Sequence, residues 1–173
     1  MRIDVIQDLI NSKGYKRYLE IGIQDGVCFN QIECEVKVGV DPFPRVIVDY
    51  QMTSDAFFSQ NKDFYDIIFI DGLHTKEQAL KDFYNALECL SEGGVIVFHD
   101  TNPDNKEYTS QLWCGDVYRA IVHLWSVGFE LYTHPEDHGV TVVTGHKELK
   151  KPHEYEDSYV WFDLNRDKVL NFV

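Results

Sequence analysis

The sequence predicts an α/β fold, namely a doubly wound, Rossmann-like and mostly parallel seven-stranded sheet with an antiparallel hairpin at its edge. Four apolar runs end on short polar signatures, at residues 18–26, 36–41, 66–74 and 94–100. Near-continuous β-branched runs of this kind are typical of parallel strands that helices cover on both faces. Amphipathic stretches separate the runs, and strands that alternate with helices build a parallel sheet.

The N-terminal part is expected to form a helix, a strand and a second, short helix. Apolar residues recur at helical spacing over 3–13, and Gly14 ends that helix. The first strand then covers 18–23. A short helix follows Gly26, a residue type that permits a tight turn between strand and helix.

Two more strands are expected at 36–41 and 46–50, separated by a turn that contains two prolines. A helix begins near residue 54, with Ser54 or Asp55 as its N-cap, because both side chains can accept a hydrogen bond from the first helical turn. The following strand covers 67–71.

The central part is expected to form a helix, a turn, a strand and a loop. An amphipathic pattern over 76–90 predicts the helix, and Gly93-Gly94 turns the chain into a strand over 95–99. Residues 101–112 are polar and rich in turn-forming residues, which predicts a mobile loop over the site.

The C-terminal part is expected to form a helix near 116–127 and two strands at 129–134 and 140–145, which five residues separate as in a hairpin. The tail, 146–173, is charged with interspersed aromatic residues and is assigned no element. We expect a single domain over residues 1–173, because this length suits one hydrophobic core.

The charge of the chain argues against a nucleic-acid partner. Its formal net charge is −13 and its pI is near 4.8, whereas binding to a phosphate backbone needs clustered Lys and Arg. No apolar run approaches the roughly 18–20 residues of a membrane span, and the start of the chain lacks the apolar core of a secretory signal. Its four cysteines include no Cys-x-x-Cys pair. We therefore expect a cytoplasmic protein that acts on a small molecule, without a membrane or nucleic-acid partner.

Polar residues at the ends of the first two predicted strands indicate a nucleotide-like ligand. Glu20, Gly22 and Gly26 lie at the end of the first strand, where glycines let the backbone turn and approach a ligand closely. Asp41 ends the second strand, and an acidic side chain there can accept hydrogen bonds from both hydroxyls of a ribose. The spacing differs from the Gly-x-Gly-x-x-Gly dinucleotide fingerprint. The glycine loop and Asp41 together favour an adenosine-type ligand, and the alternative is that they form only a turn and a helix cap.

A second group of polar residues closes the two central strands. Asp71 and His74 follow one strand, and His99 and Asp100 end the next, so the four side chains are expected to meet at one edge of the sheet. They could hold a cation that lowers the pKa of a bound hydroxyl, and a histidine can take the proton. The structural alternatives are that Asp71 caps the next helix and that His99 and Asp100 form a hydrogen-bonded pair without a metal.

Four segments carry a resemblance to a known family: EIGIQDG at 20–26, VGVDP at 38–42, FIDGLHTKEQALKDF at 69–83 and LSEGGVIVFHDTNP at 90–103. Through them the chain resembles class I S-adenosylmethionine-dependent methyltransferases. More narrowly, it is similar to the small metal-dependent O-methyltransferases of the methyltransferase family 24-like group.

The resemblance implies S-adenosylmethionine as the cofactor and assigns its contacts. Residues around the glycine loop shape the pocket for the methionine part, Asp41 holds the ribose, and residues 52–55 lie where the family contacts adenine. The full implied set of cofactor-binding residues is Glu20, Gly22, Ile23, Gly26, Asp41, Thr53, Ser54, Asp55 and Asp71.

The resemblance also implies a metal site and a general base. Asp71 and Asp100 match the metal ligands of the family, and His99 stands where the family often has a carboxylate or an amide; these three form the expected metal site, for Mg²⁺ or Mn²⁺. His74 matches the base, with a substrate-orienting or exposed histidine as the alternative. If His99 is a direct ligand, its imidazole favours Mn²⁺, Fe²⁺ or Zn²⁺ over Mg²⁺. Otherwise His99 supports the site or touches the substrate.

Three functions are compatible with these residues. The preferred one is metal-assisted O-methylation of a small hydroxylated molecule, such as a sugar. Gln24 and Asp25 replace small residues that are common in the glycine loop, so a non-catalytic binding module of the same fold is one alternative. A metal-dependent hydrolase that uses the four-residue cluster is the other. Because the chain leaves little room for a substrate cap, a second copy of the chain or a large partner is expected to complete acceptor recognition.

Overall fold

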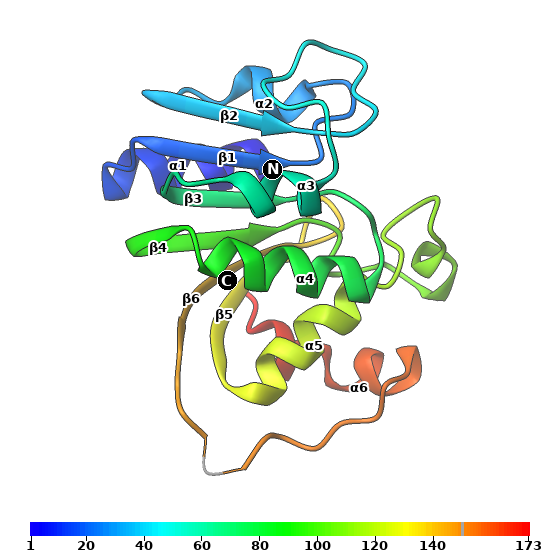
Figure 1. Ribbon diagram of the computed structural model, residues 1–173. Coiled ribbons are helices and arrows are strands. Elements are labelled where there is room, and N and C mark those ends of the chain that lie inside the picture. The colour runs from blue at the N-terminus through cyan, green and yellow to red at the C-terminus, as the bar shows by residue number, and fades with distance from the viewer. Residues whose placement is uncertain (150) are drawn as a thin grey trace.

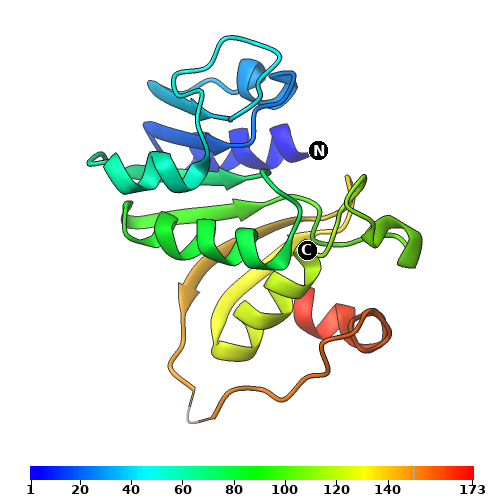
Figure 2. The same cartoon turned by 45° about the vertical axis from the view of Figure 1, so that its right-hand side comes forward.

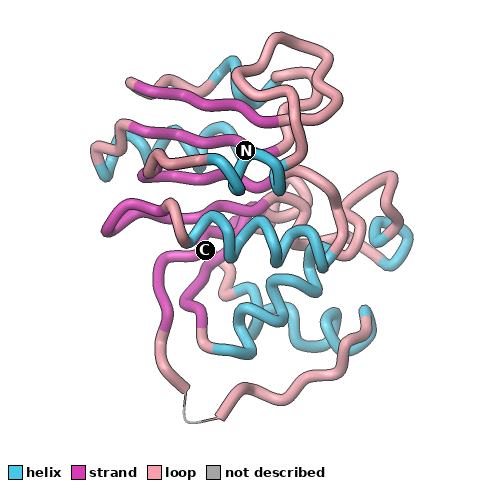
Figure 3. The backbone as a smooth tube through the Cα atoms, viewed as in Figure 1, coloured by secondary structure: helices cyan, strands magenta, loops and turns pink. Residues whose placement is uncertain are grey.

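The computed structural model describes residues 1–149 and 151–173, and within them a six-stranded mixed sheet lies between two layers of helices (Figure 1, Figure 3). The strands are β1 (Arg17–Ile21), β2 (Val36–Val40), β3 (Tyr65–Ile70), β4 (Leu90–Phe98), β5 (Phe129–His134) and β6 (Val140–His146). The helices are α1 (Arg2–Lys13), α2 (Val27–Gln31), α3 (Ser54–Gln60), α4 (Lys76–Leu87), α5 (Val117–Val127) and α6 (Tyr159–Leu170), with a short 3₁₀ helix η1 at Lys106–Thr109.

The strands lie in the order β2-β1-β3-β4-β6-β5. The first four run parallel, β6 is antiparallel to β4, and β5 is antiparallel to β6. The predicted α/β class and the antiparallel edge hairpin are therefore confirmed, whereas the count of seven strands is wrong for the part of the chain that the structure describes.

Helices cover both faces of the sheet (Figure 2), and side chains from the two faces form two separate cores. In β3, Ile68 packs into the core that α3, α4, α5 and α6 cover, whereas Ile67 and Phe69 pack into the core that α1 and α2 cover. Successive side chains of a strand point to opposite faces. Burial on both faces is the reason why the central strands read as continuous apolar runs.

The register of the sheet brings the ends of the parallel strands to one level. Ile21 at the end of β1 pairs with Val40 of β2 and with Ile70 of β3, and Ile70 pairs with Phe98 of β4. The residues that directly follow these four positions, namely Gly22, Asp41, Asp71 and His99, therefore meet at one edge of the sheet.

The strand expected at 46–50 is not formed. Only Tyr50 pairs with β2, in an isolated parallel bridge, and Ile47 is 99% exposed. The Asp49 carboxylate instead accepts a hydrogen bond of 2.8 Å from the backbone N–H of Gly39. The Asp49 side chain thus accepts a hydrogen bond that a neighbouring strand would otherwise accept from the edge of β2. The apolar run at 46–48 stays outside the sheet.

The N-cap of α3 also differs from the expectation. Thr53, not Ser54 or Asp55, is the N-cap, and its hydroxyl accepts a hydrogen bond of 3.2 Å from the N–H of Ala56. Ser54 and Asp55 are the first helical residues, so their side chains are left to interact with α4.

Two boundaries change in the second half of the chain. The helix predicted over 76–90 ends at Leu87, and β4 already begins at Leu90, with Gly93 and Gly94 inside the strand rather than before it. A register shift against β3 accommodates this early start.

The tail contains a helix that the sequence pattern did not indicate. In α6, Phe162 and Leu170 are fully buried, whereas Leu164 is 81% exposed. No helix in the described parts of the chain combines the length and apolarity needed to cross a bilayer.

Candidate active site

A cavity of about 770 Å³ opens at the carboxyl ends of β1, β2, β3 and β4. Its wall contains every predicted site residue except Gly26. The residues of both predicted groups, the nucleotide end and the reacting end, therefore share one continuous space.

The glycine loop after β1 is shaped by two close approaches. Gly22 has φ +92°, and a Cβ there would lie 2.1 Å from the carbonyl oxygen of Asp71. Gly26 has φ +75° as the N-cap of α2, and a Cβ there would lie 2.9 Å from the Val46 side chain. The lack of a side chain at Gly22 thus lets the end of β1 approach Asp71 closely. At Gly26, which lies outside the cavity wall, it lets the glycine loop pack against Val46.

Asp41 holds the loops at the nucleotide end together. Its Oδ2 accepts hydrogen bonds from the backbone N–H of Ile23 (2.9 Å) and Gln24 (2.8 Å), and its Oδ1 accepts one from Phe43 (2.6 Å). The carboxylate therefore orients both the glycine loop and the turn after β2. Its predicted contact with a ribose would add to this structural role.

Glu20 is the most buried of the predicted cofactor-binding residues, with 1% of its surface exposed. Burial raises its pKa to about 8, against the opposing effect of the hydrogen bond that it accepts from the Tyr18 hydroxyl. A polar group of a ligand could reach this carboxyl group only from the cavity.

Four residues form the reacting cluster: Asp71, His74, His99 and Asp100. Nε2 of His74 lies 3.5 Å from Oδ1 of Asp71 and 3.3 Å from Oδ2 of Asp100. Nδ1 of His99 lies 3.3 Å from each of the same two oxygens. The two imidazoles therefore bridge the two carboxylates, as the topology of the strand ends predicts.

The loop that precedes α5 fixes the orientation of His74. Nδ1 of His74 donates to the carbonyl oxygen of Trp113 at 2.5 Å, and the N–H of Asp116 donates to the carbonyl oxygen of His74 at 3.2 Å. Gly115, with φ +58°, lets the two segments approach, since a Cβ there would lie 1.9 Å from that carbonyl oxygen. The donor role of Nδ1 leaves Nε2 to face the carboxylates.

Asp71 does not cap the helix that follows it. The Thr75 hydroxyl is the N-cap of α4 and accepts from the N–H of Gln78, while Asp116 accepts from the N–H of Lys76. The Asp71 carboxylate is thus available to the reacting cluster.

The charges in the cluster shift one another's pKa values. Burial opposes the ionised form of Asp71, but hydrogen bonds from His74 and His99 outweigh it and lower the pKa well below its usual range. Burial likewise disfavours a charged His74, and its contacts with Asp71 and Asp100 raise the pKa nonetheless. The two carboxylates therefore raise the pKa of both imidazoles.

Arg2 and Asp137 adjoin the four-residue cluster, and sequence reasoning missed both. A guanidinium nitrogen of Arg2 contacts Nε2 of His99 and lies 3.2 Å from Oδ1 of Asp137. The neighbouring carboxylates raise the pKa of His99 despite its burial, whereas the guanidinium, which can only donate, favours the neutral ring. No local pattern connects residues 2, 99 and 137, because only the folded chain brings them together.

The aromatic side chains in and after the loop that precedes α5 differ in their exposure. Trp113 is 54% exposed, while Val117 and Tyr118 are buried in the core. Val117 and Tyr118 therefore have a packing role, whereas Trp113 packs on Tyr108, with 5.0 Å between the ring centres, and does not line the cavity. Gln111 of the preceding loop lines the cavity.

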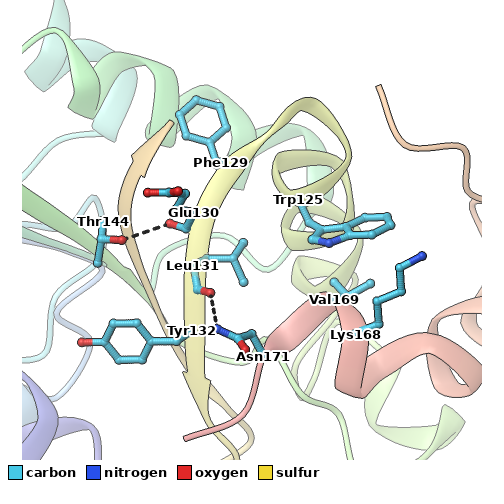
Figure 4. Close-up of a pocket in the computed structure, with 9 residues that line it drawn as sticks. All are labelled: Trp125, Phe129, Glu130, Leu131, Tyr132, Thr144, Lys168, Val169 and Asn171. Carbon is cyan, nitrogen blue, oxygen red and sulfur yellow. Dashed lines mark hydrogen bonds between the residues drawn. The ribbon is translucent and has the colours of Figure 1, made fainter. Parts of the chain in front are cut away.

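A second hollow, of about 460 Å³, lies between β5, α5 and α6 (Figure 4). The Lys168 ammonium group lies 5.0 Å from the centre of the Trp125 ring at its wall. None of the predicted site residues line it. The chemistry-bearing residues thus gather in the first cavity alone.

Comparison with known proteins identifies the kind of fold that surrounds this cavity. Residues 19–101 match a family model described as a methyltransferase domain. No curated protein matches the chain.

Several solved structures share the fold at low sequence identity. An O-methyltransferase from Bacillus cereus in complex with S-adenosylhomocysteine is 16% identical, with a TM-score of 0.57 over 84% of this chain and 80% of that one. The O-methyltransferase TomG from Streptomyces achromogenes, in complex with S-adenosylmethionine, is 15% identical, with a TM-score of 0.56 over 84% and 80%. The N-methyltransferase NodS from Bradyrhizobium japonicum is 15% identical, with a TM-score of 0.56 over 86% and 94%.

The family match covers the glycine loop, Asp41 and the whole reacting cluster, and the shared fold extends over most of the chain. Through this match and this fold, the chain is shown to be similar to the class I S-adenosylmethionine-dependent methyltransferases.

Proposed function

We propose that this chain binds S-adenosylmethionine in the cavity and transfers its methyl group to an oxygen of a small hydroxylated acceptor, with a sugar as one candidate. One observation carries the proposal: a single cavity joins the glycine loop and Asp41 to the reacting cluster. Two structural neighbours were solved with S-adenosylhomocysteine or S-adenosylmethionine, which supports the choice of cofactor.

The cofactor would extend along the ends of the strands. Asp41 would hold the ribose, Thr53, Ser54 and Asp55 the adenine, and Glu20 and the glycine loop the methionine part. The reacting cluster, at the other end of the cavity, would then hold the acceptor oxygen in line for transfer of the methyl group.

His74 is the proposed general base. Its Nε2 lies beside the Asp71 and Asp100 carboxylates, and the Trp113 carbonyl holds the opposite ring nitrogen as a donor. The cofactor would supply the activated methyl group, with the S–C bond electrons left on sulfur, and Nε2 of a neutral His74 would take the proton that the acceptor hydroxyl loses. The chain itself supplies position and charge stabilisation, because the sulfonium already activates the methyl group.

The donor set of the cluster fits a divalent cation. Ligand atoms of Asp71, His74 and Asp100 all lie within 4.8 Å of one another, and His99 adjoins both carboxylates. A cation held by Asp71 and Asp100 would lower the pKa of a bound hydroxyl and offset the two negative charges. Whether His99 or His74 completes the ligand set stays a prediction.

Calorimetric titration of S-adenosylhomocysteine into the protein, with Mn²⁺ and again with EDTA, tests the proposal. We expect micromolar binding in both conditions and a separate metal-binding signal that Asp71→Ala abolishes. A protein that binds neither the cofactor product nor the metal would refute the proposed function.

One observation favours a non-catalytic module as the second candidate. Asp25 lines the cavity at the start of α2, where its negative charge would oppose the cofactor carboxylate. Cofactor binding without turnover on a panel of sugars, phenols and amines would support this alternative.

A further inference from the structure

The wall of the cavity contains an arginine at its reacting end, to which the proposed function assigns no ligand. Arg2 is the first residue of α1, and this end of the helix lies beside the carboxyl ends of the strands (Figure 1). Its side chain lines the cavity and is 29% exposed. Among the described residues of the wall, Arg45 is the other one with a permanent positive charge, and its N–H bonds to the glycine loop at the nucleotide end. Arg2 therefore supplies the permanent positive charge of the reacting end.

Asp137 and His99 hold one nitrogen of the Arg2 guanidinium. Oδ2 of Asp137 accepts a hydrogen bond of 3.1 Å from the backbone N–H of Arg2, and its Oδ1 accepts one of 3.2 Å from Nη1. The same Nη1 contacts both ring nitrogens of His99. The turn between β5 and β6 thus fixes both the backbone and the side chain of Arg2.

The other two nitrogens of the guanidinium are available to a ligand. In the described parts of the chain, no hydrogen bond or ion pair reaches Nε or Nη2 of Arg2, and neither atom is a buried nitrogen without a partner. Both atoms therefore keep accessible surface on a side chain that lines the cavity. Nε and Nη2 share one edge of the planar group, and such an edge can donate two parallel hydrogen bonds to a carboxylate. A carboxylate has two coplanar oxygens and the opposite charge, so it matches this edge better than a hydroxyl group does.

One side chain separates Arg2 from the place of the proposed methyl transfer. His99, which Arg2 contacts, has its Nδ1 3.3 Å from an oxygen of Asp71 and from an oxygen of Asp100. These two oxygens also lie within 3.5 Å of Nε2 of His74, so two imidazoles offset part of the negative charge that an anionic acceptor would meet. An acceptor whose hydroxyl group reaches His74 can therefore extend past His99 to Arg2.

We propose that Arg2 determines acceptor specificity and that the acceptor is a hydroxy acid, whose carboxylate accepts hydrogen bonds from Nε and Nη2 of Arg2. A sugar acid is the form of the sugar candidate that fits this wall. The inference rests on the proposed function, since it assumes an acceptor hydroxyl group at the reacting cluster. It narrows the acceptor class from hydroxylated small molecules to those that carry a carboxylate.

Calorimetric titration with two matched pairs of probes tests this specificity. The pairs are glucuronate with glucuronamide and salicylate with salicylamide, and each probe is titrated into protein saturated with S-adenosylhomocysteine and Mn²⁺. Wild type is expected to bind at least one acid about tenfold or more tightly than its amide, because hydrogen bonds between charged groups are stronger than those to a neutral group.

Three variants assign the preference to Arg2. Arg2→Gln should bring the ratio of the two affinities to within about threefold, since the charge-assisted pair is lost. Arg2→Lys keeps the charge without the planar edge and should give an intermediate ratio. Lys13→Gln, the same cation-to-amide change at an exposed position near the other end of α1, should keep the wild-type ratio. The affinity of each variant for S-adenosylhomocysteine shows that the cavity is intact.

The outcomes separate this inference from the proposed function. Tight binding of S-adenosylhomocysteine without a preference of wild type for either acid would overturn the acceptor class and leave the cofactor assignment intact, and this comparison needs no variant to fold. A preference that Arg2→Gln retains would overturn the role of Arg2. Failure of wild type to bind S-adenosylhomocysteine would remove the proposed function and this inference with it.

Discussion

At the scale of single residues, Glu20 couples stability to pH. Its pKa is raised to about 8 in the folded chain, chiefly by burial, while in the unfolded chain the group ionises near its ordinary value of about 4.3. As pH rises above that value, the unfolded state loses its proton first. The contribution of Glu20 to stability is therefore fully present at low pH and is lost as pH rises toward 8.

We expect Glu20→Gln to remove this part of the pH dependence. Between pH 5 and pH 8, the free energy of unfolding of wild type should fall relative to that of the variant by up to about 4 kcal/mol. Urea denaturation at a series of pH values measures the difference, and comparison with the variant cancels the other titrating groups. Parallel pH curves for the two proteins would contradict a protonated Glu20 in the fold.

His74 allows a residue-scale test of chemistry. His74→Ala should leave the affinity for S-adenosylhomocysteine within about twofold and lower turnover by about 10²–10⁴, the usual range for loss of a general base. His146→Ala serves as the control, because His146 is exposed and does not line the cavity. Full turnover in His74→Ala, measured as methyl transfer to an accepted substrate, would reject the base role.

At the scale of elements, the contact between the loop before α5 and the segment after β3 decides where His74 points. Gly115 has φ +58°, and the carbonyl oxygen of His74 occupies the space that its Cβ would need. Gly93 has φ +76°, but no atom lies within 4 Å of its Cβ position. The two glycines share the left-handed conformation and differ in crowding.

Gly115→Ala should therefore cost more than Gly93→Ala. The left-handed conformation alone costs about 1–2 kcal/mol for a residue with a Cβ, which we expect for Gly93→Ala, and the clash adds to this in Gly115→Ala. Gly115→Ala should also lower turnover, because the Trp113 carbonyl moves away from His74. Urea denaturation and turnover check the two effects, and equal behaviour of the variants would show that the close approach is unimportant.

At the scale of the whole molecule, the C-terminal tail belongs to the core. Phe162 of α6 is fully buried and packs on Tyr118 of α5, with 4.7 Å between the ring centres. Phe172 forms an isolated bridge with Thr133 at the edge of β5. The tail thus covers α5 and the outer strand of the sheet.

Phe162→Ala should lower the free energy of unfolding by about 3–5 kcal/mol, as is usual for a large aromatic side chain removed from a core. Leu164→Ala on the same helix should change it by less than about 0.5 kcal/mol, because Leu164 is 81% exposed. Thermal and urea unfolding measure both values. A small effect of Phe162→Ala would mean that the tail is a separate appendage.

The sequence predicts the elements that depend on local signals. Gly14 gives the correct end of α1, and the apolar runs give nearly correct boundaries for β1 and β2. The expectation fails at 46–50, where an apolar run of strand-like composition lies outside the sheet because Asp49 occupies the edge of β2. It also fails at α6, whose apolar residues do not repeat regularly enough to show one buried face.

The sequence by itself determined the α/β class and the edge of the sheet at which the polar residues meet, because a parallel sheet aligns the ends of its strands whatever the loops do. Only the tertiary structure decided that Arg2 and Asp137 join His99, and that Arg2 and Asp82 line the same cavity. These contacts join residues that lie far apart in the chain. Packing of whole helices and loops creates them, and no local pattern of the sequence records such packing.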